Sequence, residues 1–91
     1  MSSIVVRQLE PHHFAVEVAE KDVATRHKVA VRPELLDEHG LARADEADVV
    51  REAMAFLLER LPASAIQGDF PLEQLGDHYA EFWDELSLRL S

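Results

Sequence analysis

The sequence predicts an α+β domain in which a three-stranded antiparallel meander is followed by a short helix, a central helix and a C-terminal amphipathic helix packed on one face. Three observations lead to this prediction: three strand-like runs before Pro33, one long helical pattern over residues 45–61, and a second apolar stripe with helical spacing from Pro71 onward. At 91 residues the chain has the size of one domain, so we expect a single α+β domain over residues 1–91.

The predicted strands cover residues 4–9, 14–20 and 25–32. The first run is rich in β-branched residues, and the other two alternate apolar and polar side chains. Such alternation is typical of antiparallel strands that pack one face on a core and leave the other face in solvent. His27 falls on the apolar face of the third run, so we expect a partly buried histidine that is hydrogen-bonded to a neighbour.

The predicted central helix over residues 45–61 is apolar around much of its circumference. Asp45 is a good N-cap, and Pro62 stops the helix. The apolar arc covers roughly 200°, against about 100° for an ordinary surface helix. Such a helix needs cover from two directions, by a sheet on one side and by a second helix or a second subunit on the other. Val49 and Phe56 widen the arc, and we predict that they are candidate interface residues.

Two prolines mark the starts of the other predicted helices. Pro33 opens a short helix over residues 34–39, and Pro71 opens the last helix. The apolar stripe of the last helix consists of Leu72, Leu75, Tyr79, Phe82, Leu86 and Leu90. Trp83 lies at the edge of this stripe and Leu88 lies off it, which makes both of them further candidate interface residues.

The composition limits which cellular compartment and which classes of partner we expect. The formal net charge is −9, and residues 34–91 carry four basic and fourteen acidic side chains. This acidic part repels nucleic acid and anionic membranes. The chain has no cysteine, no apolar run near the roughly 20 residues of a membrane span, and no signal-peptide pattern at its start. We expect a cytoplasmic protein without a membrane partner.

A basic stripe lies on the third predicted strand, where Arg26, Lys28 and Arg32 share one face. This strand leads into two helices over residues 27–60, through the segments V-A-V-R-P-E-L-L and V-V-R-E-A-M-A-F-L-L. In that order the stretch resembles the ribbon-helix-helix family. The resemblance implies DNA binding, with a strand that pairs across a dimer to read the major groove and a helix N-terminus that meets a phosphate. The stripe is therefore a candidate anion or nucleic-acid face.

The chain also departs from that family. The first helix is short, two strands precede the basic one, and the second helix begins with Asp45, Glu46 and Asp48, which repel a phosphate. The competing interpretation is a solvated strand face whose basic residues pair with Glu17 across the hairpin. A DNA-binding regulator or antitoxin-like protein is the alternative function, but nucleic acid is not the partner that we favour.

A second resemblance covers more of the chain. It rests on Thr25-x-His27-x-Val29-x-Val31, on the later F-L-L-E-R, and on the S-x-I-x-x-x-F-x-L-x-x-L run over residues 64–75. These segments look like a group of short, uncharacterised bacterial proteins with no assigned activity. The resemblance supports the α+β fold and implies no chemistry.

The histidines do not show the spacing of a metal site. Asp77, His78 and Glu81 are near one another on the last helix, and His12 and His13 lie in a loop. A tight site needs three or four convergent ligands with further support, and the spacing shows no such convergence. We therefore predict no metal ligands and no cofactor.

Signals of catalysis are also absent from the sequence. No Ser or Thr stands in a nucleophile motif, and three glycines do not make a phosphate-binding loop. A small enzyme would need a pocket with perturbed titratable groups around His27 or His78. We predict no catalytic residues and favour a non-enzymatic protein-interaction or regulatory module, a homodimer whose protein partner the sequence does not identify.

Overall fold

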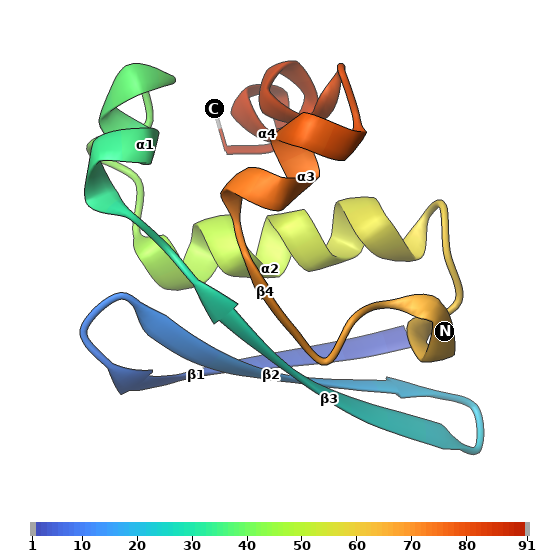
Figure 1. Cartoon of the computed structure of the whole chain (residues 1–91). Helices are drawn as coiled ribbons and strands as arrows, with labels where there is room; N and C mark the ends of the chain where they lie inside the picture. Colours follow the sequence, from blue (N-terminus) through green and yellow to red (C-terminus); the bar gives the residue numbers. More distant parts are fainter. Residues whose placement is uncertain (1, 91) are drawn as a thin grey trace.

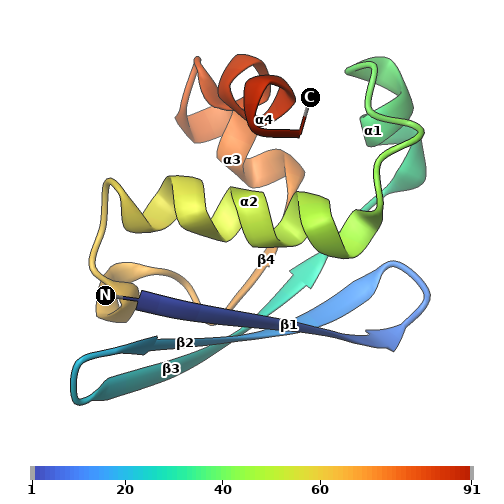
Figure 2. The same cartoon turned by 180° about the vertical axis from the view of Figure 1, so that it is seen from behind.

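A computed structural model describes residues 2–90, and it contains the predicted meander. Strands β1 (Ser2–Glu10), β2 (His13–Glu20) and β3 (Val23–Ala30) pair antiparallel in chain order. All four α-helices lie on one face of this sheet, as Figures 1 and 2 show. The predicted α+β class and the helix-covered sheet are therefore confirmed.

A fourth strand completes the sheet and was not predicted. Strand β4 (Asp69–Pro71) pairs parallel to β3, so the sheet is mixed and has the order β1-β2-β3-β4. Phe70 stands opposite Val29, and both side chains are buried. The strand has only three residues and ends in a proline, so it carries neither alternation nor length that would reveal it in the sequence.

Two-residue turns set the register of the meander. Pro11 and His12 join β1 to β2, and His12 has a φ of 67°. Proline followed by a residue with positive φ is the arrangement of a type II turn. Between β2 and β3, Lys21 adopts a φ of 52°, so this turn forms without the glycine that usually supplies such a backbone. His12 Nδ1 also lies 2.9 Å from a carboxylate oxygen of Glu46, which ties the first turn to the central helix.

The central helix α2 (Glu46–Leu58) forms the middle layer of the molecule. Asp45 is its N-cap, and the side chain accepts a hydrogen bond of 2.8 Å from the backbone N–H of Ala47. One side of α2 packs on β1 and β2, and another side packs against α4 (Phe82–Leu90). Figure 2 shows α2 between the sheet and the α3–α4 pair.

The other helices are short. They are α1 (Pro33–Glu38), a 3-10 turn η1 (Ala63–Ala65) and α3 (Glu73–His78). None of the helices within residues 2–90 has the length and apolar character needed to cross a membrane.

The predicted C-terminal helix is divided into α3 and α4. At Tyr79 the backbone is extended, with a φ of −126° and a ψ of 109°. The break allows two aromatic rings to meet Phe56 edge-on, at centroid distances of 5.4 Å for Tyr79 and 5.2 Å for Phe82. The guanidinium of Arg60 lies 3.6 Å from the Phe56 ring centroid and 3.3 Å from a carboxylate oxygen of Glu81. These contacts hold the chain at the break.

The core accounts for most of the apolar arc of α2. Its buried members on this helix are Val49, Val50, Ala53, Met54, Phe56 and Leu57. Val49 and Phe56 are 0% exposed. The prediction that these two residues form an interface with a second subunit is therefore wrong, because α4 of the same chain supplies the second cover.

A partly buried arginine joins α4 to α2. The Arg89 guanidinium contacts Glu59, and it lies 3.5 Å from Glu85 and 3.8 Å from Glu52. The hydrogen bond with Glu59 raises the pKa of Arg89 above its ordinary value, against the effect of burial, and the charges of all three carboxylates add to the increase. Arg89 consequently keeps its charge, and it neutralises part of the acidic surface at the joint between the two helices.

Replacing Phe56 with alanine tests whether this residue is a core residue. We expect Phe56→Ala to lower the free energy of unfolding by about 3–5 kcal/mol, because it removes a buried ring and leaves a cavity between α2 and the α3–α4 break. Urea unfolding followed by circular dichroism measures the change. Asp77→Ala, at an exposed position of α3, is the control and should stay within about 0.5 kcal/mol of the parent protein. A loss below about 1 kcal/mol for Phe56→Ala would contradict the buried position of this ring between α2 and the α3–α4 break.

Candidate interaction surface

The face of the sheet opposite the helices is open to solvent (Figures 1 and 2). We call this surface the outer face; on β1, β2 and β3 it is formed by Ser3, Val5, Arg7, Ala15, Glu17, Ala19, Ala24, Arg26 and Lys28. The strand registers place Val5, Glu17 and Arg26 in one row across the three strands. The outer face thus combines small apolar residues with charges of both signs.

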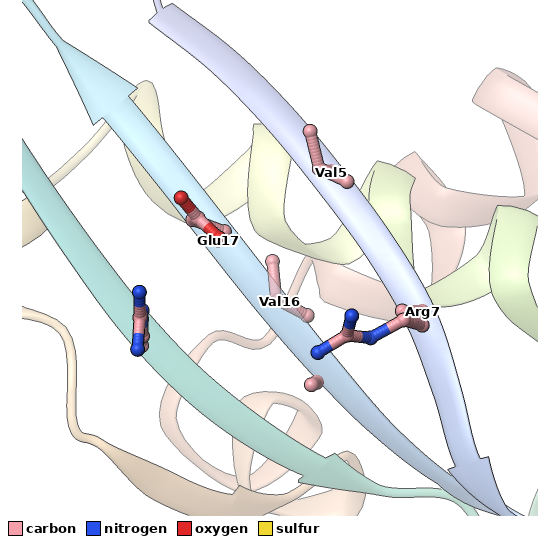
Figure 3. A pocket seen from close by; sticks show the side chains of 6 residues that line it. Val5, Arg7, Val16 and Glu17 are labelled. Carbon is pink, nitrogen blue, oxygen red and sulfur yellow. The ribbon is translucent and has the colours of Figure 1, made fainter.

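A shallow hollow of about 310 Å³ lies on the outer face. Figure 3 shows Arg7 reaching from β1 over β2, with Val5 and Glu17 nearby. Ala15 stands directly between Arg7 and Lys28 in the register, and its single methyl group leaves room between the two longer side chains. The hollow offers a guanidinium, a carboxylate and apolar contacts to a partner, without enclosing it.

The predicted basic stripe is only partly assembled. Arg26 and Lys28 are exposed on the outer face. Arg32 lies beyond the end of β3, where its Nε is 3.2 Å from a carboxylate oxygen of Glu73. Arg7 joins Arg26 and Lys28 instead. The sequence pattern did not place Arg7 on this surface, because its position depends on the hairpin register, which the two turns fix.

Acidic residues interrupt the same surface. Glu17 stands opposite Arg26, and Asp69 stands opposite Lys28. The interpretation that the basic residues pair with Glu17 across the hairpin fits the register only for Arg26, because Lys28 stands opposite Ala15 and Asp69. Strand β3 also lies between β2 and β4, and β4 pairs with its residues Lys28, Val29 and Ala30. The end of β3 that carries Lys28 is therefore not open to the intermolecular strand ribbon of the ribbon-helix-helix family.

The outer edge of β1 is a second open surface. β1 is the longest strand and stands at one end of the sheet, whereas β4 at the other end has three residues and terminates in Pro71. Val5 and Leu9 on β1 are 58% and 48% exposed, and they are two of the four large apolar side chains exposed in the described chain. Edge strands of this kind present unpaired backbone N–H and C=O groups, which bind another strand readily.

The two candidate interface residues on α4 have different surroundings. Leu88 is 73% exposed. The Trp83 indole is half-buried, stacks on the His39 ring at a centroid distance of 3.9 Å, and meets the Phe82 ring edge-on at 4.9 Å. It also lies against Gly76, where a Cβ atom would overlap the ring. These contacts favour a role for Trp83 at the edge of the core rather than in an interface.

His27 is buried, and both of its ring nitrogens form hydrogen bonds within the chain. Its Nδ1–H donates to the backbone carbonyl of Gln67 at 2.7 Å, because a carbonyl can only accept. Nε2 then accepts from the Thr25 hydroxyl at 2.8 Å. His27 thus joins β3 to the segment before β4. The expected hydrogen bond to a neighbour is confirmed, and the side chain is more deeply buried than expected.

The remaining histidines lie apart. His12 pairs with Glu46 at the first turn, and His39 stacks on Trp83. His78 lines a hollow of about 200 Å³ beside the C-terminal end of α2, together with apolar side chains such as Leu61 and Tyr79. Within residues 2–90, no three His, Asp or Glu side chains come close enough to hold a metal ion.

Comparisons with protein-family models, with curated proteins and with solved structures find no match for the chain. Function is therefore inferred from the outer face and the edge of β1. Both surfaces are built by the meander, and neither is closed off by the helix layer.

A glycine substitution tests the placement of Trp83, which is the only tryptophan. We expect Gly76→Ala to displace the indole from α3, to shift its fluorescence, and to lower stability by about 1–3 kcal/mol through overpacking. Gly68→Ala is the matched control, because a Cβ at Gly68 meets nothing within 4 Å. Equal fluorescence spectra and equal unfolding midpoints for the two variants would refute the Trp83–Gly76 contact.

Proposed function

We propose that this chain is a non-enzymatic protein-interaction or regulatory module that acts as a homodimer in the cytoplasm. The observation that carries the proposal is the open side of the sheet, where Val5 remains 58% exposed at the junction of the outer face and the edge of β1. Exposed apolar residues next to an unpaired strand edge are typical of binding surfaces. Val49 and Phe56 on the apolar arc of α2 no longer support a second subunit, since the chain itself covers them.

The bonds that the polar side chains form within the chain support a non-enzymatic role. His27, which is the buried titratable residue on the sheet, has both ring nitrogens bonded within the chain. Arg60 and Arg89 are engaged with carboxylates at the joints between helices. The hollow on the outer face is open, and its charged residues stand on strands whose small neighbours give little enclosure. Such a surface suits a macromolecular partner better than a small substrate.

Chain size and strand exposure favour self-association. A chain of this length buries only about 60–65% of the surface that its unfolded form exposes, so a second copy adds useful burial. An unpaired edge strand with apolar residues is also an aggregation hazard unless something covers it. A homodimer that covers this edge removes the hazard and enlarges the core.

Light scattering across a concentration series tests the homodimer. At micromolar concentration we expect a particle with about twice the 10.3 kDa mass of one chain. The mass should fall toward one chain on dilution, because mass action governs association. A protein that keeps the mass of one chain up to millimolar concentration would contradict the homodimer.

A second candidate is a DNA-binding regulator or antitoxin-like protein. The observation in its favour is that Arg7 joins Arg26 and Lys28 on the outer face, which gives three neighbouring cations on adjacent strands. Glu17 and Asp69 on the same surface oppose it, because carboxylates repel phosphates.

A binding assay at about 50 mM salt separates the two candidates, because phosphate contacts are strongest at low salt. The interaction module predicts that no duplex is retained. The DNA-binding candidate predicts retention that Lys28→Glu abolishes. Lys21→Glu is the matched control, since it makes the same charge change in the β2–β3 turn. Equal loss in both variants would point to net charge alone, and loss only in Lys28→Glu would favour the second candidate over the first.

A further inference from the structure

We propose that two copies of this chain join edge to edge through β1, antiparallel and about a twofold axis at Val5, so that two four-stranded sheets become one eight-stranded sheet. The inference rests on the proposed homodimer and names its contact. It assigns the surface to the strand edge and the flank of α2, rather than to Trp83, Leu88 or the outer face.

The regular part of β1 has its centre at Val5. Residues Ser2 to Gln8 pair with β2 in unbroken register, and an irregularity follows between Gln8 and Glu10. A bulge twists an edge strand and ends its use for further pairing. The stretch that can accept a second strand is thus residues 2–8, and Val5 is its midpoint. A twofold axis at Val5 uses every residue of this stretch.

In this register, the side chains of the two β1 strands that stand opposite each other are also well matched. An axis at Val5 places Val5 opposite its own copy and Ile4 opposite Val6, so the three central pairs are all apolar. Arg7 then faces Ser3. An axis at Val6 would instead set Val5 against Arg7. An axis at Arg7 would bring two arginines face to face, which is unfavourable.

The edge of β1 can form nearly as many main-chain hydrogen bonds as a typical specific interface contains. Seven paired residues in an antiparallel ladder form roughly seven main-chain hydrogen bonds, against about ten in a typical protein interface. Every donor and acceptor of this ladder is supplied in equal number by the two identical strands. Ile4 and Val6, which are half-buried at the rim of the core, gain apolar neighbours in the same contact.

The helix layer adds to the contact on the same side. In Figure 2, α2 and β1 face the viewer together, and Figure 1 shows both behind β3 and β4. By helical spacing, Ala47, Arg51 and Leu58 share one flank of α2, and Ala47 and Leu58 are partly buried hydrophobic residues. The helix itself packs on β1. Across the axis the two copies of α2 run antiparallel, and a small residue such as Ala47 permits the approach of about 8–10 Å found between packed helices.

The charges on this flank also permit self-association, although each chain has a formal net charge of −9. Arg51 is paired with Asp48 on its own helix at 3.0 Å. Glu52 and Glu59 lie toward α4, where Arg89 contacts both of them. The acidic residues of α2 are thus partly neutralised or turned away from the second copy.

Cysteine cross-linking tests the register directly, because the chain contains no cysteine. Directly paired residues in antiparallel strands have Cα atoms roughly 4.5–5.5 Å apart, a separation that a disulfide can bridge. With a mild oxidant, Val5→Cys chains should become predominantly disulfide-linked dimers. An equal mixture of Ser3→Cys and Arg7→Cys chains should give a linked heterodimer. Arg7→Cys alone should remain unlinked, and Lys21→Cys, in an exposed turn, controls for random collisions.

The outcomes separate this contact from the homodimer in general. If the parent protein is dimeric but Val5→Cys links no faster than Lys21→Cys, or if Arg7→Cys links with itself, the β1 register is overturned and the homodimer stands. If the parent protein is monomeric at millimolar concentration, both fail. Val5→Glu gives a second measurement: it places two carboxylates at the axis and should yield a folded monomer, as judged by circular dichroism and light scattering. A Val5→Glu variant that remains dimeric would also overturn the contact.

Discussion

The structure depends on the burial of α2 from two directions. Its apolar arc is too wide for a sheet alone, and the layer above it is complete only because the chain breaks at Tyr79 and returns as α4. The edge-on contacts of Tyr79 and Phe82 with Phe56 set the position of that return. Arg89 on α4 then forms ion pairs with carboxylates of α2, which fasten the two helices together. Because one helix receives both covers, the opposite side of the sheet has none, and the surfaces available to partners lie there and along β1.

Electrostatics divides the molecule in the same way. The helical part carries most of the acidic residues, and the arginines at its joints, Arg60 and Arg89, bind carboxylates inside the chain. The outer face instead alternates charges, with Glu17 opposite Arg26 and Asp69 opposite Lys28. A surface of alternating sign has a weak long-range field but specific short-range complementarity, which suits recognition of a shaped partner more than attraction of a polyanion.

Sequence patterns predicted the elements that depend on contacts between residues close in the chain. The alternation around His27, the cap at Asp45 and the helical spacing of α2 gave three strands and the central helix within a few residues of their observed bounds. Elements that depend on distant contacts were missed. β4 is a strand only because β3 stands beside it, and the last helix breaks only because Phe56 and Arg60 meet Tyr79 and the residues after it. Val49 and Phe56 were misplaced for the same reason, since a helical wheel shows that cover is needed but not which segment supplies it. Arg7 joined the outer face through a register that only the turns determine.

The bond between His27 and Gln67 has a consequence for how the chain folds. Its two partners are separated by 40 residues, whereas the hairpins between β1, β2 and β3 close over two residues each. Closing a long loop costs more chain entropy than closing a short one, so the meander can assemble early and β4 must wait for the helices between them. With that order of assembly, residues 28–30 of β3 have no outer partner until β4 docks. The buried side chain of His27 bonds to Gln67 just before β4, so it helps to hold that strand beside β3 once the helices are in place.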